Sequence, residues 1–184
     1  MWLWLILACG NEKEVPDTDE EAVCAWEAPD NRWPLAAPPE GLCGEGFDIG
    51  EIAPDVRLTD QFGDEVSLWQ FYGTPVMLEA NTMWTYSYDR VIDDISDEYG
   101  VMVVSLLSQD AMTQVPSAED VDDWIETYDI ETPVLIDDMG HSEAVIAPNQ
   151  YYNTARLLGA DMRVLTPAIN IDDERTLREA LDAL

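Results

Sequence analysis

The spacing of hydrophobic residues changes several times after residue 50, and each spacing predicts a different element. Short apolar runs bounded by Gly, Pro or Asp predict β-strands. The run at 101–107 is apolar except at Ser105, which is typical of a strand inside a parallel sheet. The predicted strands span residues 56–60, 75–80, 101–107 and 133–137, and the run 66–71 suits either a short strand or a helix start after a turn at 61–65.

Apolar residues three and four positions apart predict three helices. Ser117 suits the N-cap of the second helix. Residues 155–159 and 163–167 predict a hairpin before the last helix. The order is therefore β-α-β-α-β, then a hairpin and a helix, which predicts an α/β fold with a central mixed β-sheet flanked by helices. The helical positions are Tyr88, Val91, Ile92, Ile95 and Tyr99 in the first, Val121, Trp124, Ile125 and Tyr128 in the second, and Leu177, Leu181 and Leu184 in the last.

Composition and charge narrow the possible partners. The chain has 184 residues, of which 47% are hydrophobic, and this is too apolar for a disordered protein. Its 39 acidic residues against 8 basic ones give a formal charge of -31, which would repel nucleic acid and anionic lipid. We therefore expect no nucleic-acid partner. A solvated acidic surface suited to salty surroundings is favoured over a dedicated store of cations.

The apolar start of the chain, MWLWLILACG, resembles the end of a bacterial lipoprotein signal peptide. It is too short to span a bilayer, which takes roughly 20 apolar residues. The resemblance implies a signal peptide at 1–8, a lipid anchor in the membrane at Cys9 and an acidic tether at 9–22. No Lys or Arg precedes the apolar run, which departs from the secretory pattern and favours a start codon further upstream. We expect an exported protein of the bacterial cell envelope, lipid-anchored on the periplasmic side or at the cell surface.

Cys24 and Cys43 form an even pair once Cys9 is set aside, as expected in an oxidising compartment. A disulfide between them would close a loop rich in Pro, Trp and Ala, and would stabilise it by about 3 kcal/mol. We therefore expect a bridged N-terminal segment at 23–49. A structural role is favoured over a redox role, because Arg32 is the one basic residue near either thiol in sequence.

The stretch from Ile49 to Trp84 resembles the opening of the redoxin family, the AhpC/TSA and TlpA-like proteins of thioredoxin fold. The likeness rests on Ala-Pro-Asp at 53–55, a Gly-containing turn at 60–63, Phe-Tyr-Gly at 71–73 and a strand that runs into Trp84. It continues through 128–140 and through 153–164. The resemblance implies a thioredoxin-like (redoxin) domain over 50–184, with thiol-disulfide or peroxide-reducing activity.

The residues at the family's active-site positions depart from its pattern. By position, the nucleophilic Cys of the family is Thr85, the resolving Cys is Tyr88, and the cis-proline is Asn153. An alcohol lacks the acidity of a thiol at a helix N-terminus, and Tyr cannot form a disulfide. A cis bond before Asn153 would cost about 2.5–4 kcal/mol, so we expect a trans bond. The sequence therefore predicts a degenerate active site with no catalytic residue.

A catalytic nucleophile and a metal site were also considered, and the sequence supports each of them less well. Thr85 is expected to be a helix N-cap rather than a nucleophile, because no base is identifiable beside it. His141 lies in an acidic turn with no Cys or second His nearby, so we expect a solvated residue and no transition-metal site. Carboxylates at 93, 94, 97 and 98 could hold calcium, although a solvated helix face is the more usual meaning. We expect no metal and no cofactor.

The aromatic residues Trp84, Tyr86 and Tyr88 follow a sheet strand, where open α/β folds bind ligands. They could form an interaction surface, or they could pack on their own domain, and the sequence favours neither. We predict an envelope lipoprotein that has lost thiol-disulfide activity and serves as a binding or scaffolding module for an unknown protein partner. One alternative is a thiol-disulfide oxidoreductase or peroxide-reducing antioxidant protein that uses Cys24 and Cys43. Another is a calcium-dependent surface protein.

Overall fold

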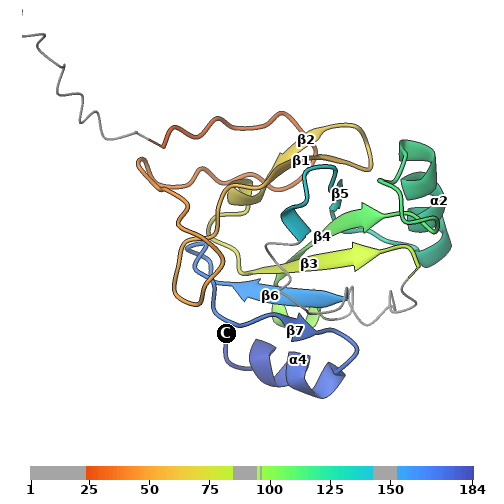
Figure 1. Ribbon diagram of the computed structural model, residues 1–184. Helices are drawn as coiled ribbons and strands as arrows, with labels where there is room; N and C mark the ends of the chain where they lie inside the picture. The colour runs from red at the N-terminus through yellow and green to blue at the C-terminus, as the bar shows by residue number, and fades with distance from the viewer. Residues whose placement is uncertain (1–23, 85–94, 96, 143–152) are drawn as a thin grey trace, which may run out of the picture.

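Strand β3 (Val76–Thr82) is the centre of the molecule, and all seven of its residues are buried. The structure is a computed structural model that describes residues 24–84, 95, 97–142 and 153–184. It contains a seven-stranded sheet in the order β2-β1-β5-β4-β3-β6-β7 (Figure 1). β3 pairs in parallel with β4 (Met102–Gln109), which in turn pairs in parallel with β5 (Val134–Ile136).

The outer strands run antiparallel to their neighbours. β1 (Arg57–Asp60) pairs with β5 and with β2 (Glu65–Ser67), which leads into a single 3-10 turn, η1 (Leu68–Gln70). On the other side, β6 (Thr154–Leu158) pairs with β3 and with the two-residue strand β7 (Ile169–Asn170). The sheet is therefore mixed, as the sequence predicts.

The helices also agree with the periodicity, within the described residues. α2 (Ala118–Tyr128) begins at Ser117, whose side chain accepts a hydrogen bond from the backbone N–H of Asp120. α4 (Glu174–Leu181) buries Leu177 and Leu181. Ile95 is helical and fully buried, while Tyr88, Val91 and Ile92 lie outside the described residues.

The predicted hairpin forms only in part. β6 is its first arm, but residues 163–167 join β6 through an isolated bridge between Leu158 and Val164. The physical reason is that this segment also bonds to the chain at 50–52: the N–H of Gly50 donates to the carbonyl oxygen of Val164 at 2.8 Å. The next strand, β7, has only two residues and was not predicted.

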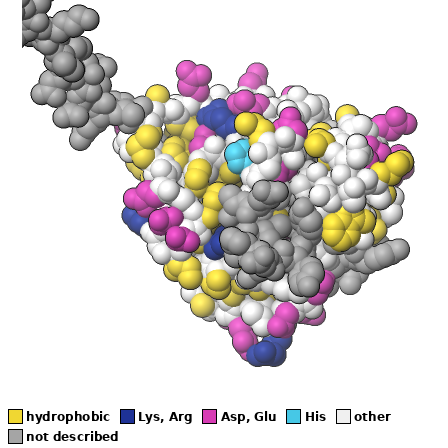
Figure 2. All heavy atoms as spheres, viewed as in Figure 1, with side chains coloured by type: hydrophobic (Ala, Val, Ile, Leu, Met, Phe, Trp, Pro, Cys, Tyr) yellow, Lys and Arg dark blue, Asp and Glu magenta, His cyan; other side chains and the backbone are white. Residues whose placement is uncertain are grey.

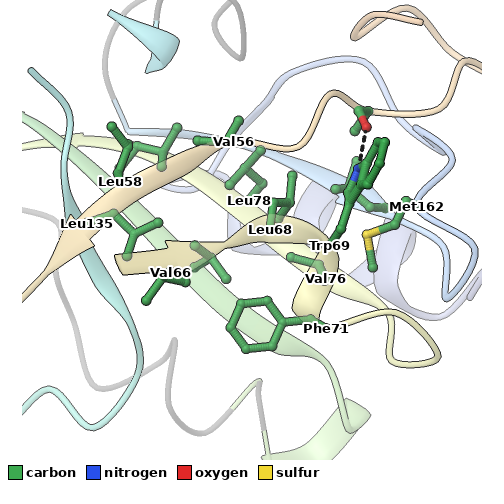
Figure 3. Close-up of a cluster of buried hydrophobic side chains, with 14 of the residues drawn as sticks. Val56, Leu58, Val66, Leu68, Trp69, Phe71, Val76, Leu78, Leu135 and Met162 are labelled. Atoms are coloured by element: carbon green, nitrogen blue, oxygen red, sulfur yellow. Dashed lines mark hydrogen bonds between the residues drawn. The ribbon is translucent and has the colours of Figure 1, made fainter. Parts of the chain in front are cut away.

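Alternate residues of the central strands enter two different cores. Val76, Leu78 and Ala80 of β3 face a first cluster, and Met77 faces a second. The first cluster is covered by β1, β2, η1 and Met162, and Trp69 donates its indole N–H to the carbonyl oxygen of Ala53 at 2.8 Å (Figure 3). The second cluster includes apolar residues of α2 and α4. Burial on both faces explains why most residues of β3 and β4 are apolar and do not alternate with polar ones.

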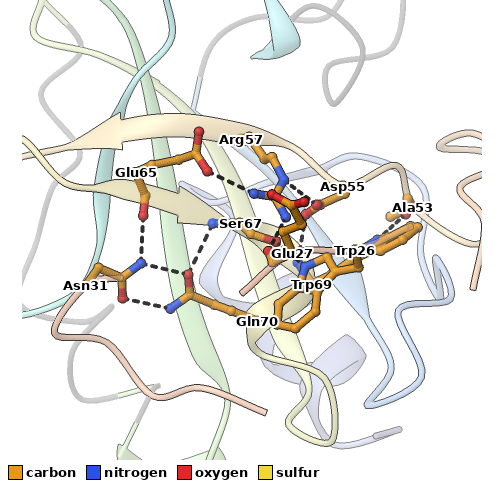
Figure 4. A network of polar contacts seen from close by, with 10 residues as sticks. All are labelled: Trp26, Glu27, Asn31, Ala53, Asp55, Arg57, Glu65, Ser67, Trp69 and Gln70. Atoms are coloured by element: carbon orange, nitrogen blue, oxygen red, sulfur yellow. Dashed lines mark hydrogen bonds and ion pairs between the residues drawn. The ribbon is translucent and has the colours of Figure 1, made fainter. Parts of the chain in front are cut away.

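Residues 24–49 form an N-terminal segment that lies along the edge strand β2. Trp26 donates its indole N–H to the Ser67 hydroxyl at 2.8 Å, and the Asn31 amide donates to the Glu65 carbonyl oxygen at 2.7 Å (Figure 4). Asn31 and Gln70 also exchange amide hydrogen bonds in both directions. An uncovered edge strand invites pairing with other chains, and this segment covers it.

A disulfide between Cys24 and Cys43, which are separated by 19 in sequence number, closes the N-terminal segment. The pairing agrees with the sequence-based expectation. Trp26, Trp33, Leu42 and Phe47 of the segment pack against the first cluster. The segment is therefore part of the same folded body as the sheet, while the expected boundary at residue 50 remains a prediction.

Replacement of the disulfide is expected to destabilise the protein. Cys24→Ser should lower the free energy of unfolding by about 3 kcal/mol, because the unfolded chain regains the entropy of an open loop. Urea unfolding followed by circular dichroism, with and without reductant, measures the loss. The wild type in reductant should match the variant, and equal stability of the oxidised wild type and the variant would contradict the expectation.

Candidate functional site

The carboxyl ends of β3, β4 and β5 meet at one edge of the sheet, because these three neighbouring strands are parallel. We call this the carboxyl edge; it comprises residues 82–84, 109–116 and 137–141. Open α/β sheets bind their ligands at such an edge, where the strand order changes direction. Here the chain continues from β3 to β4 on one side, while β6 pairs with β3 on the other.

Trp84 is placed at this edge by hydrogen bonds to the neighbouring strand. The register shifts between Asn81 and Thr82, and the backbone N–H of Met83 donates to the carbonyl oxygen of Gln109 at 2.9 Å. The indole N–H of Trp84 donates to the side-chain oxygen of Gln109, also at 2.9 Å. The residue is nevertheless 42% exposed. Trp84 is therefore anchored at its nitrogen, while part of its ring faces solvent.

Exposed hydrophobic side chains recur where each of the three parallel strands ends. Trp84 follows β3, Met112 and Val115 follow β4, and Met139 follows β5. Their exposed fractions are 42%, 79%, 53% and 71%. Figure 2 shows hydrophobic side chains among acidic ones on the side of the molecule where α2 and the ends of β3 and β4 lie. Large apolar side chains gathered at one edge are typical of an interaction surface.

A hollow of about 300 Å³ opens beside this edge, between α2 and the loop that follows β4. Trp124 and Tyr128, one helical turn apart on α2, are in edge-to-face contact with ring centroids 5.8 Å apart. We call it the α2 hollow. Its lining consists of Met83, Ala111, Met112, Trp124, Thr127 and Tyr128, with the carboxylates Asp110, Asp120 and Asp123.

Two carboxylates of the α2 hollow are held by the chain's own hydrogen bonds. Asp110 accepts the backbone N–H groups of Met112 and Gln114 at 2.7 and 2.8 Å, which closes the turn after β4. Asp120 accepts the hydroxyl and the backbone N–H of Ser117. These bonds, the hydroxyl's first, lower the pKa of Asp120 from its ordinary value, so the carboxylate is charged at neutral pH.

A buried polar cluster lies within the sheet, on the face of the second core. Glu79 of β3 is fully buried, and its Oε2 accepts the Ser105 hydroxyl at 2.7 Å and the Asn81 amide at 3.0 Å. A carboxylate in such a place depends on hydrogen bonds, because burial removes its water. Glu79, Asn81 and Ser105 are all buried, so we assign this cluster to the folded interior.

The residues expected at the family's active-site positions fall partly outside the described structure. Thr85, Tyr86 and Tyr88 lie outside the described residues, as does the expected lipidation site Cys9. Asn153 is described: it is buried, has a φ of 66° and donates its N–H to the carbonyl oxygen of Ala80 at 3.0 Å. The peptide bond before it involves Tyr152, outside the described residues, so the expected trans bond stays a prediction.

His141 and the acidic residues considered as metal ligands do not form a metal site in the described part of the chain. The backbone N–H of His141 donates to Asp137 at 2.9 Å within the turn after β5. In the ranges 24–84, 97–142 and 153–184, no three His, Cys, Asp or Glu side chains are grouped to hold a metal ion. Asp93 and Asp94 lie outside those ranges. None of the described helices has the length and hydropathy of a membrane-spanning segment.

The disulfide belongs to the N-terminal segment and not to the carboxyl edge. Both cysteines are partly exposed. A second hollow, of about 370 Å³, lies beside Cys24 and is lined by Trp26, Pro38 and Pro39 among others. The redox alternative would therefore place its chemistry at this second hollow.

Several residues of the carboxyl edge were missed by sequence reasoning. Met112, Val115 and Met139 stand singly in loops, and Gln109 looks like the ordinary polar end of a strand. Only the rule that parallel strands end at one edge could have drawn attention to the loops. Glu79 had a clearer signal, because it interrupts the apolar run 75–80.

Solved structures with a similar architecture include thiol-disulfide proteins and a peroxidoxin. A secreted thiol-disulfide isomerase from Corynebacterium glutamicum aligns with 80% of this chain and 97% of its own, at a TM-score of 0.56 and 17% identity. The thioredoxin domain of a thiol-disulfide oxidoreductase from Bacteroides vulgatus aligns with 73% of this chain and 98% of its own, at a TM-score of 0.56 and 16% identity. Peroxidoxin BcpB from Mycobacterium tuberculosis aligns with 74% of this chain and 95% of its own, at a TM-score of 0.56 and 17% identity.

These likenesses establish the fold, which is thioredoxin-like. The predicted fold class is therefore confirmed. No protein-family description matches the sequence, and no curated protein matches it. At identities of 16–17% the activities of the solved proteins do not transfer to this chain.

Loss of the buried hydroxyl beside Glu79 is expected to destabilise the sheet. Ser105→Ala removes a hydrogen bond to a fully buried carboxylate and should lower the free energy of unfolding by about 1–3 kcal/mol. Ser108→Ala is the matched control, because its half-buried hydroxyl donates to the Asn81 carbonyl oxygen at 3.2 Å and should cost less. Urea denaturation compares the two, and an equal or smaller loss for Ser105→Ala would contradict the assignment.

Proposed function

We propose that this chain is an exported protein whose thioredoxin-like domain serves as a binding module, with the carboxyl edge as its interaction surface. The observation that supports this most is the exposure of Trp84, Met112, Val115 and Met139 where three adjacent parallel strands end. Methionine suits such a surface, because its flexible thioether adapts to different partners. Trp84 adds a large ring fixed at its nitrogen by Gln109, a feature of residues that dominate binding energy.

The absence of thiols from the family's active-site positions supports binding rather than redox catalysis. Thr85 and Tyr88 stand where the redoxin resemblance places two cysteines. Neither side chain can take part in a disulfide, so these positions cannot be reduced by a substrate dithiol or oxidised by a substrate disulfide. The fold is retained, and the remaining chemistry at the edge is apolar and acidic.

An envelope location is consistent with the other features of the chain. The lipobox-like residues 6–9 support a lipid anchor at Cys9, and the disulfide is typical of an oxidising compartment. Secreted proteins occur among the structural neighbours. The charge of -31 makes nucleic acid an unsuitable partner, so we propose a protein partner.

A second candidate function is thiol-disulfide exchange at Cys24 and Cys43. The hollow beside Cys24 favours it, because a peptide could approach a partly exposed disulfide there. In that reaction a substrate thiolate would attack one sulfur of the bridge, form a mixed disulfide and release the other sulfur as a thiolate. Among the described residues, no Lys, Arg or His lines this hollow to stabilise that thiolate.

Insulin reduction in dithiothreitol separates the two functions. The purified protein should give no rate above the uncatalysed reaction, because the family positions hold Thr85 and Tyr88. A catalysed rate that disappears in Cys24→Ser would establish the second candidate instead. A rate that survives this change would contradict both assignments.

The binding function predicts a difference between two similarly exposed hydrophobic residues. In chemical cross-linking on intact cells, Trp84→Ala should lower the yield of specific cross-linked products at least several-fold, because it removes the anchored ring of the carboxyl edge. Leu165→Ala is the matched control: it is 44% exposed but lies in the turn region after β6, and it should leave the products unchanged. Equal effects of the two variants would contradict a binding role for the edge.

A further inference from the structure

The α2 hollow combines apolar walls with a carboxylate rim, which is a combination that selects a particular kind of ligand. Met83, Met112, Trp124 and Tyr128 supply apolar and aromatic surface. Trp124 is only 7% exposed, so it forms the floor, whereas Met112 is 79% exposed and stands at the mouth. A space of about 300 Å³ admits one or two amino-acid side chains rather than a folded domain.

The stretch of sequence that supplies most of the lining of the hollow carries only acidic charges at neutral pH. The 65 residues between Arg90 and Arg156 contain fifteen Asp and Glu and no Lys or Arg. Cationic side chains elsewhere are largely engaged: Arg178, for example, pairs with Glu98 and Glu174. A cation that approached the α2 hollow would therefore meet the carboxylates of Asp120 and Asp123 without competition from the chain's own basic residues in that stretch.

The state of these carboxylates argues against a bare metal ion. Asp110 accepts two backbone N–H groups, and Asp120 accepts two groups of Ser117, so both are already committed to turns and caps. Held in this way, they present a fixed negative rim but do not converge on one point. Such a rim suits Lys or Arg side chains, which reach a carboxylate from outside and keep their own hydration in part.

We propose that the α2 hollow binds a basic segment of a partner polypeptide, with one apolar or aromatic side chain in the hollow and flanking Lys or Arg side chains on Asp120 and Asp123. This inference rests on the proposed binding function and names the partner's chemistry. Met112 lines the hollow and also belongs to the carboxyl edge, so a segment bound in the hollow continues onto that edge. Charge complementarity selects the partner and speeds its association.

A fluorescently labelled synthetic peptide, in which a central Phe is flanked on both sides by Lys, tests the proposal with the full-length protein. Fluorescence anisotropy at low and high salt should show binding that weakens as salt rises. A peptide with Glu in place of Lys should not bind, and one with Ala in place of Phe should bind more weakly. Equal binding of the Lys and Glu peptides would overturn the proposal.

Two matched pairs of variants locate the peptide. Asp123→Asn should weaken binding about three- to fivefold, the range of an exposed ion pair, whereas Asp122→Asn on the same helix should have less effect, because Asp122 does not line the hollow. Met112→Ser should likewise weaken binding more than Met139→Ser, which alters the same edge outside the hollow. Equal effects within either pair would overturn the location.

The outcomes also separate this proposal from the binding function on which it rests. If the Lys peptide fails to bind while Trp84→Ala still removes the cross-linked products in cells, the carboxyl edge is a binding surface and the α2 hollow is not a site for basic segments. If the peptide fails and Trp84→Ala has no effect in cells, both proposals are wrong. Peptide binding that depends on Asp123 and Met112 supports the α2 hollow whatever the effect of Trp84→Ala.

Discussion

Burial of the central strands β3 and β4 on both faces of the sheet is the constraint on which the rest of the structure depends. β3 and β4 pair in parallel and present apolar residues to both faces, so each face needs its own cover. Helices α2 and α4 contribute to the cover on one face, and the β1–β2 hairpin with η1 and the N-terminal segment contributes to the cover on the other. Trp69, Phe71 and Met162 complete the first cluster, and their absence would leave the apolar side of β3 in water.

The same constraint determines where function can lie. With both faces of the central sheet covered, the exposed ends of the strands offer the chain's least committed surface. Side chains in the loops at such an edge need not pack in the core, so large apolar side chains can stand partly exposed there. The exposed methionines and Trp84 occupy these positions, and the acidic residues of α2 lie beside them. The strongly acidic surface around the apolar edge keeps the protein soluble. The apolar side chains of the edge remain available for contact with a partner.

Most of the fold could be predicted from the sequence, because long apolar runs and helical spacing are local signals. Val101 to Leu107 and the face of α2 at Val121 and Trp124 are examples. β7 could not be predicted, since two residues have no period and their pairing depends on β6. The α2 hollow was equally inaccessible, because its walls come from Met83, from the turn at 110–112 and from α2, which only the folded sheet brings together. The aromatic Trp84 could be chosen as a candidate, but its exposure required the structure.

The disulfide also determines how the domain responds to a pulling force. Tension applied through residues that precede Cys24 crosses the bridge to Cys43 and continues toward Ile52 and β1. Residues 25–42 are thereby removed from the path of the load, so the contacts of Trp26 and Asn31 with β2 and of Trp33 with Asp60 of β1 are not broken one after another. The red start of the described chain and the tips of the β3 and β4 arrows lie toward opposite sides of the molecule (Figure 1). A chain held at its N-terminus would thus keep its edge-strand cover in place and turn its carboxyl edge away from the point of attachment.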